Sequence, residues 1–179
     1  LFNLSEAIGF DLGFVDIGGG FIGKDLGHLD QYAASINAGI DKYFADPKIT
    51  IISEPGRYFV DSAFKIVTQV ILKKKGLDDH IQYFVNEGIY MSFLISFIYE
   101  EKLNFSIIRK SSNNYNPDEK KMSTIWGCTC NSKDKILGNQ LMEELSENDW
   151  IIFHNMGAYT NTVSTSFNGF SIGEIVIID

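Results

Sequence analysis

Three consecutive glycines, Gly18–Gly20, follow one apolar stretch, and the segment Ser53–Arg57 (SEPGR) follows the next. The bare N–H groups of a glycine-rich loop bind anions, and the guanidinium of Arg57 is a fork of donors that suits phosphate. Glu54 adds one carboxylate beside this group. A phosphate cradle with one isolated carboxylate is typical of a site for pyridoxal phosphate, a phosphorylated cofactor with a basic ring nitrogen. A plain turn between a strand and a helix is the alternative interpretation of the glycines.

The elements that would position these residues form a βαβ unit. A stretch that is nearly all apolar predicts a buried strand over Leu12–Ile17. A second short strand is predicted over Ile49–Ser53 and closes with a Pro-Gly turn. Between them, apolar residues at helical spacing predict an amphipathic helix over Asp25–Phe44. Such a unit implies a parallel sheet, in which ligands bind at the carboxyl ends of the strands. The glycines and the second strand's end are therefore expected at the same edge.

From Tyr58 onward the sequence changes to β-branched and alternating stretches, which predict strands. These stretches are YFVDSAFKIVTQVILKKK, IQYFVNEGIYMSFLISFIY, FSIIRK, DWIIFHNMGAY and FSIGEIVIID. The segment Leu137–Leu145 is interpreted as a short helix or an irregular connection. The sequence thus predicts an α/β part at 1–60 followed by a β-rich domain at 61–179, which is incomplete at its end.

Composition narrows the class of protein. A net charge of −8 over 179 residues argues against nucleic acid or an anionic membrane as partner, and no apolar run approaches the ~18 residues of a membrane span. Only two cysteines occur, Cys128 and Cys130, too close together for an ordinary disulfide, which favours a reducing, cytoplasmic setting. The three histidines are scattered, so no metal site is expected. The chain begins at Leu1, in mid-pattern, as a piece of a longer protein would.

Five blocks carry a resemblance to a known family. They are VDIGGGF, ISEPGRYFVDSAF, YFVNEGIYMSF, STIWGCTCNSKD and ENDWIIFHNMGAYTNTVSTSFNGF. In this order they resemble the eukaryotic ornithine decarboxylases, fold type III pyridoxal-phosphate enzymes. The resemblance implies the last part of a (β/α)8 barrel that binds the cofactor, followed by a β-rich sandwich or Greek-key barrel. It also implies decarboxylation of a basic amino acid, L-ornithine to putrescine in polyamine biosynthesis, by a homodimer with shared active sites that antizyme could bind.

The resemblance assigns roles residue by residue. In the first part of the chain, most of the matching positions bind the cofactor phosphate. Glu54 matches the glutamate that pairs with the pyridine nitrogen of the cofactor. Tyr159, in the second part, matches a tyrosine whose hydroxyl also reaches the phosphate. The phosphate-binding positions of the first part are Gly18, Gly19, Gly20, Gly56 and Arg57.

Other matches concern catalysis and the substrate. Cys130 matches the cysteine, contributed across the dimer interface, that guides protonation after carbon dioxide leaves, and Phe167 matches an aromatic residue of the substrate pocket. Two positions depart from the family pattern, which has acids that bind the distal ammonium of ornithine. Asn131 replaces an aspartate, and Glu100 is the best match for a second aspartate. These replacements predict weak use of ornithine, and a decarboxylase for another cationic substrate is a further alternative.

A non-catalytic relative is the rival interpretation. Antizyme inhibitors bind antizyme and regulate the enzyme, and they replace the phosphate-binding arginine and the tyrosine of the MGAY block. Arg57 and Tyr159 are present in this chain, which favours an enzyme. In this family the lysine that holds the cofactor covalently lies upstream of the region matched by this sequence.

Overall fold

The computed structural model describes residues 2–23, 27–110 and 118–178. The chain divides into two compact units, Leu1–Ala63 and Phe64–Asp179. Among the described residues, no helix combines the length and apolar character needed to cross a bilayer.

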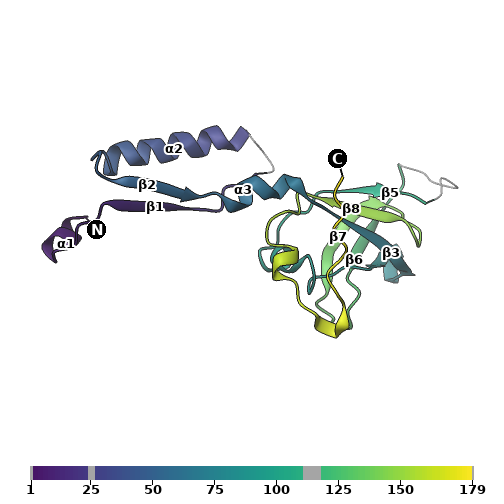
Figure 1. Cartoon of the computed structure of the whole chain (residues 1–179). Helices are drawn as coiled ribbons and strands as arrows, with labels where there is room; N and C mark the ends of the chain where they lie inside the picture. Colours follow the sequence, from purple (N-terminus) through teal and green to yellow (C-terminus); the bar gives the residue numbers. More distant parts are fainter. Residues whose placement is uncertain (1, 24–26, 111–117, 179) are drawn as a thin grey trace. The chain divides into compact units, whose positions relative to one another are not determined.

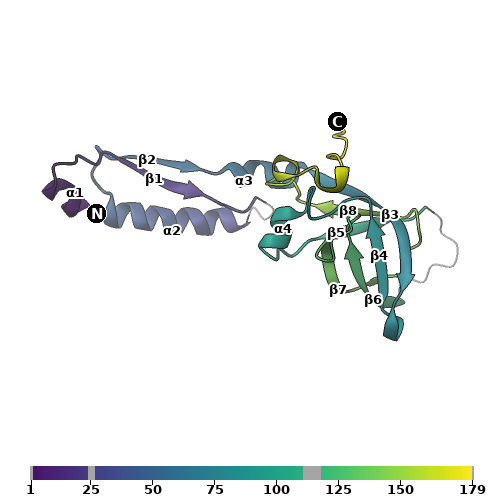
Figure 2. The ribbon, with the colours of Figure 1, turned by 90° about the horizontal axis from the view of Figure 1, so that it is seen from below.

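The first unit is built around one βαβ motif. Strand β1 (Phe14–Gly19) pairs in parallel with β2 (Thr50–Glu54), and helix α2 (Gly27–Tyr43) connects them. Figures 1 and 2 show α2 running along the two strands, with the short helix α1 (Phe2–Ala7) before β1. The positions of the predicted strands and helix and the parallel pairing are thus confirmed, with the ends of each element displaced by one or two residues. The predicted burial of the first strand is wrong, because Phe14 and Ile17 of β1 are 57% and 36% exposed.

The predicted Pro-Gly turn after β2 is wrong in its detail. Helix α3 (Gly56–Val60) begins directly after Pro55 and continues into the 3-10 turn η1 (Asp61–Ala63). Pro55 has φ −77°, close to the value that its ring imposes and that a helix start requires. The residues from Tyr58 to Ala63, predicted as strand, are therefore helical.

The second unit is a six-stranded mixed sheet with the order β5-β8-β3-β4-β6-β7. Neighbouring strands are antiparallel except β4 and β6, which are parallel. Figure 2 shows β4 between β3 and β6. The strands are β3 (Lys65–Lys75), β4 (Ile81–Val85), β5 (Phe105–Ile108), β6 (Lys120–Trp126), β7 (Lys135–Glu143) and β8 (Trp150–His154).

The core of this unit lies between the strands and the turns that follow them. The largest fully buried side chains include Tyr83, Phe93 and Phe153, and the rings of Phe93 and Phe153 meet edge to face at 4.8 Å. The Tyr83 hydroxyl accepts a hydrogen bond from the Leu145 amide at 2.8 Å. Burial raises the pKa of Tyr83 to about 12. The phenol is therefore a neutral part of the core at physiological pH.

Three predictions for this part of the chain are wrong. Leu137–Leu145 is not a helix or irregular: most of it belongs to β7, whose backbone pairs with β6. The YMSFLISFIY stretch is a turn around the Gly88 carbonyl followed by helix α4 (Leu94–Ile98). The segment 170–178 has no regular structure, because it pairs with no strand among the described residues. Part of the predicted polar loop, residues 111–117, lies outside the described residues.

The remaining short elements are the 3-10 turns η2 (Leu77–Asp79), η3 (Asn161–Val163) and η4 (Phe167–Gly169). The last two lie in the stretch between β8 and the end of the chain, where the sequence places Tyr159 and Phe167. This stretch packs against the turn after β4, since the Thr165 amide donates to the Tyr90 carbonyl at 2.8 Å.

Candidate active site

The loop at the end of β1 requires glycine for two different physical reasons. Gly18 and Gly20 have φ angles of +70° and +83°, a region that favours glycine. Gly19 has no positive φ, but a Cβ there would lie 2.0 Å from the Glu54 carbonyl oxygen. The register of the sheet places Gly19 opposite Glu54, so the two predicted site segments meet at the carboxyl ends of β1 and β2. The close pairing of β1 with β2 is therefore sufficient to require glycine at position 19.

Arg57 is positioned by a residue that the sequence interpretation missed. Asp61 is 2% exposed, and its carboxylate pairs with the Arg57 guanidinium at 3.4 Å. The other oxygen of Asp61 accepts from the Gly23 amide at 3.4 Å. Asp61 therefore ties the loop after the glycines to the helix that carries Arg57. The spacing of four residues between Arg57 and Asp61 is the signal that could have identified this pair.

The loop has the space that a bound anion needs. A Cβ added at Gly18 or Gly20 would have nothing within 4 Å, so both positions border open space. The Gly18 amide donates to Asp16 Oδ1 at 2.8 Å, which fixes the start of the loop. Glycine backbone and a guanidinium at one edge fit a phosphate group. Gly56 is the first residue of α3, between Pro55 and Arg57.

In the second unit, three of the predicted residues lie together. Asn131 Nδ2 is 2.5 Å from the hydroxyl oxygen of Tyr90, and the ring of Tyr90 lies 4.3 Å from that of Phe167. The amide of Asn168 lies against the Cys130 thiol, with Nδ2 3.4 Å from Sγ. Tyr90 and Asn168 are thus the residues that join Cys130, Asn131 and Phe167 into one cluster.

The other two predicted residues of this unit, Glu100 and Tyr159, follow α4 and β8. Glu100 follows α4 with a φ of +50°, is exposed, and makes no hydrogen bond or ion pair among the described residues. Tyr159 has a φ of +55° and is 54% exposed, in the loop after β8. A positive φ in a tyrosine is uncommon and marks a position held by its surroundings. The Thr160 hydroxyl donates to the Met156 carbonyl at 2.9 Å within this loop.

Two buried carboxylates accept hydrogen bonds from the backbone of the loops around this cluster. Asp134, 1% exposed, accepts from the amides of Ile89 and Thr129 at 2.8 and 3.0 Å, which joins the loop after β6 to the turn after β4. A Cβ at Gly88 or Gly127 would collide with Asp134, so both positions require glycine.

Glu87, 7% exposed, is the second of these carboxylates. It accepts from the amides of Gly88 and Ser92 at 3.2 and 3.1 Å. Burial raises the pKa of Glu87 and also that of the Cys128 thiol, the latter to about 11. Cys128 is therefore a protonated, unreactive thiol at neutral pH.

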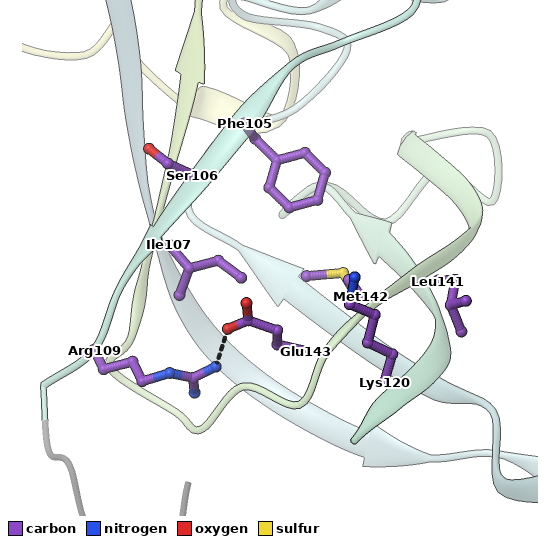
Figure 3. A pocket seen from close by; sticks show the side chains of 8 residues that line it. All are labelled: Phe105, Ser106, Ile107, Arg109, Lys120, Leu141, Met142 and Glu143. Atoms are coloured by element: carbon purple, nitrogen blue, oxygen red, sulfur yellow. Dashed lines mark hydrogen bonds and ion pairs between the residues drawn. The ribbon is translucent and has the colours of Figure 1, made fainter. Parts of the chain in front are cut away.

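A separate cavity of about 560 Å³ lies between β5 and β7, the two edge strands of the sheet. Arg109 and Glu143, which form an ion pair at 2.7 Å, line it together with Phe105, Ile107 and Met142 (Figure 3). It holds none of the residues predicted for the active site.

Comparison with known proteins agrees with a two-part chain of this kind. Residues 1–61 match the family model of the pyridoxal-binding domain of pyridoxal-dependent decarboxylases. Residues 57–157 match the model of the C-terminal sheet domain of the same enzymes. The chain belongs to the pyridoxal-dependent decarboxylase family.

The relatives in this family include enzymes and a regulator. The chain is 37% identical to ornithine decarboxylase of Rattus norvegicus over 99% of its own length and 41% of the relative's. It is 36% identical to antizyme inhibitor 2 of Xenopus laevis, over 95% of this chain and 40% of the relative. The solved structure of Paramecium bursaria Chlorella virus arginine decarboxylase bound to agmatine superposes with a TM-score of 0.81 at 36% identity, over 94% of this chain and 45% of the other. The chain thus spans about two fifths of the length of the curated relatives that it matches.

Proposed function

We propose that the full-length protein is a cytoplasmic pyridoxal-phosphate-dependent decarboxylase that converts L-ornithine to putrescine. The observation that carries this proposal is the meeting of the glycine loop and Arg57 at the carboxyl ends of two parallel strands, in a chain of this family. The first unit would then be the last part of a (β/α)8 barrel. Its apolar side chains support this, because Phe10 and Phe14 are 67% and 57% exposed, as expected where further strands and helices would cover them.

The residues of the first unit would hold the cofactor. Gly18–Gly20, Gly56 and Arg57 would bind its phosphate. By the family resemblance, the hydroxyl of Tyr159 would also reach a cofactor phosphate. Glu54 would hold a proton on the pyridine nitrogen. Pyridoxal phosphate supplies the electron sink that lets a carboxylate leave as carbon dioxide. The fixed contacts of Asp61 would keep Arg57 at the phosphate.

The residues of the second unit would act on the substrate. The Cys130 thiol would deliver the proton that replaces the lost carboxylate, and Asn168 would orient it. Phe167, held against Tyr90, would form one wall of the substrate pocket. Asn131 and Glu100 would face the distal end of the substrate. By the family resemblance, these residues would meet the cofactor of the partner subunit in a homodimer.

The competing proposal is a regulator that binds antizyme without catalysis. The likeness to antizyme inhibitor 2 and the replacement of an acid by Asn131 favour it. The presence of Arg57 and Tyr159 favours the enzyme, because a protein that binds no cofactor has no need of a phosphate site. Cofactor affinity therefore distinguishes the two proposals.

Replacing Arg57 should weaken cofactor binding. Arg57→Ala removes a charged hydrogen-bond donor from the phosphate and should lower the affinity for pyridoxal phosphate roughly 10–100-fold. Absorbance titration of the cofactor into the full-length protein measures this, and thermal unfolding checks that the variant folds. Lys48→Ala, which removes an exposed positive charge before β2, is the matched control and should leave the affinity unchanged. Equal affinity of the Arg57 variant and the wild type would refute the role of Arg57.

A further inference from the structure

The amide of Asn131 has one orientation in this structure. The Lys133 amide donates to Asn131 Oδ1 at 2.8 Å, and a backbone N–H can only face the oxygen of a side-chain amide. Nδ2 must therefore face Tyr90, and it donates to the Tyr90 hydroxyl oxygen at 2.5 Å. An aspartate at position 131 would do the reverse, because a carboxylate can only accept and would take the hydrogen of the Tyr90 hydroxyl.

This orientation changes what Tyr90 offers. Its hydroxyl oxygen accepts from Asn131, so its own hydrogen points elsewhere. Within residues 2–23, 27–110 and 118–178, no side chain or carbonyl accepts that hydrogen. The second N–H of Asn131 Nδ2 has no acceptor in the same part of the chain. The pair therefore presents two unused donors and no charge.

The two donors lie beside the residues proposed to act on the substrate. Tyr90 is half-buried, and Phe167 packs on its ring at 4.3 Å. Asn131 follows Cys130 in the chain, and the neighbour of Phe167, Asn168, contacts the Cys130 thiol. The Tyr90–Asn131 pair is therefore adjacent in the chain to the residue proposed to deliver the proton.

We propose that Tyr90 is a specificity-determining residue that donates a hydrogen bond to the distal end of the substrate. The inference rests on the proposed function and narrows its substrate class. With Asn131 in this orientation, an ammonium meets no charged partner here, whereas a carbonyl oxygen meets two donors. The site therefore accepts an amino acid whose side chain ends in a carboxamide as readily as one that ends in an ammonium.

Two product-shaped amines test this without turnover. 1,4-Diaminobutane and 4-aminobutanamide share one primary amine and differ only at the distal group. Calorimetric titration of each into the full-length protein loaded with pyridoxal phosphate gives two dissociation constants. The wild type should bind the amide no more than threefold less tightly than the diamine. A diamine bound more than threefold tighter than the amide would overturn the proposal.

Two variants separate specificity from structure. Tyr90→Phe removes the donor and should weaken binding of the amide about tenfold, with less than a twofold change for the diamine. A structural role alone would weaken both ligands equally, and that result would overturn the proposal. Tyr43→Phe makes the same chemical change at an exposed tyrosine of the first unit and should alter neither constant.

The near-isosteric Asn131→Asp is informative even where Tyr90→Phe fails to fold. It should reverse the preference, with the diamine bound about tenfold more tightly than by the wild type, because a carboxylate then faces the ammonium. Unchanged diamine affinity would overturn the proposal. Failure of the Tyr90 proposal can be distinguished from failure of the proposed function. The proposed function fails if the protein releases no carbon dioxide from ornithine, irrespective of the dissociation constants of the two amines.

Discussion

Gly19→Ala should abolish most binding of pyridoxal phosphate, whereas Gly13→Ala, at the other end of β1, should have almost no effect. A Cβ at position 19 would lie 2.0 Å from the Glu54 carbonyl oxygen, which is backbone and cannot move without separating β1 from β2. Overpacking of this kind costs about 3 kcal/mol, which corresponds to a loss of roughly 100-fold in affinity if it falls on the folded site. Titration with pyridoxal phosphate and thermal unfolding of the full-length protein measure both effects.

Gly13 is the matched control for this change. It precedes β1, has no positive φ, and a Cβ there would have nothing within 4 Å. Gly13→Ala should therefore change stability by less than about 0.5 kcal/mol. If Gly19→Ala binds the cofactor as tightly as Gly13→Ala does, the close approach of β1 and β2 is not what shapes the phosphate loop.

Mixing two inactive variants should restore activity. The proposed site takes Arg57 from one subunit and Cys130 from its partner, so a dimer of one Arg57→Ala subunit and one Cys130→Ala subunit keeps one intact site of two. Random exchange of equal amounts then gives about 25% of the wild-type rate. Carbon dioxide release from L-ornithine before and after subunit exchange measures it, with differently tagged subunits to verify the heterodimer.

The control for this experiment is the double variant. Mixing Arg57→Ala with a protein that carries both Arg57→Ala and Cys130→Ala leaves no site with both residues, and the rate should stay at background. Absence of recovery in the verified Arg57→Ala and Cys130→Ala heterodimer would refute the shared site.

The sequence predicted the parts of the fold that depend on local patterns. The βαβ motif follows from continuous apolar strands around a helix of regular period, and it was confirmed. Strand β7 was missed because its sequence contains Gly138, Asn139 and Gln140, which have little strand preference alone. Its pairing with β6 is a tertiary effect. The reverse holds for 170–178, whose β-branched residues find no partner strand among the described residues.

The placement of the glycines beside Glu54 follows from residue type and position in the sequence. The register of β1 and β2 brings the glycines to Glu54, as the parallel sheet implied. Asp134 and Tyr90 were missed because their roles depend on contacts between residues that are distant in sequence, such as the 41-residue separation of Asn131 and Tyr90. Asp61 was missed although its spacing from Arg57 is the local signal of an ion pair on one helical face. Position 131 shows most clearly what the sequence alone does not reveal. The sequence identifies an amide, but only the Lys133 contact reveals which end of it faces Tyr90.

The most direct test of the proposed function is the release of labelled carbon dioxide from L-[1-¹⁴C]ornithine by the purified full-length protein, with and without added pyridoxal phosphate. We expect release that depends on the cofactor and is matched by putrescine in equal amount, with a rate that Asn131→Asp increases at low substrate concentration. A protein that binds antizyme, binds no pyridoxal phosphate and releases no carbon dioxide above background would contradict the proposal and identify the chain as part of a regulator.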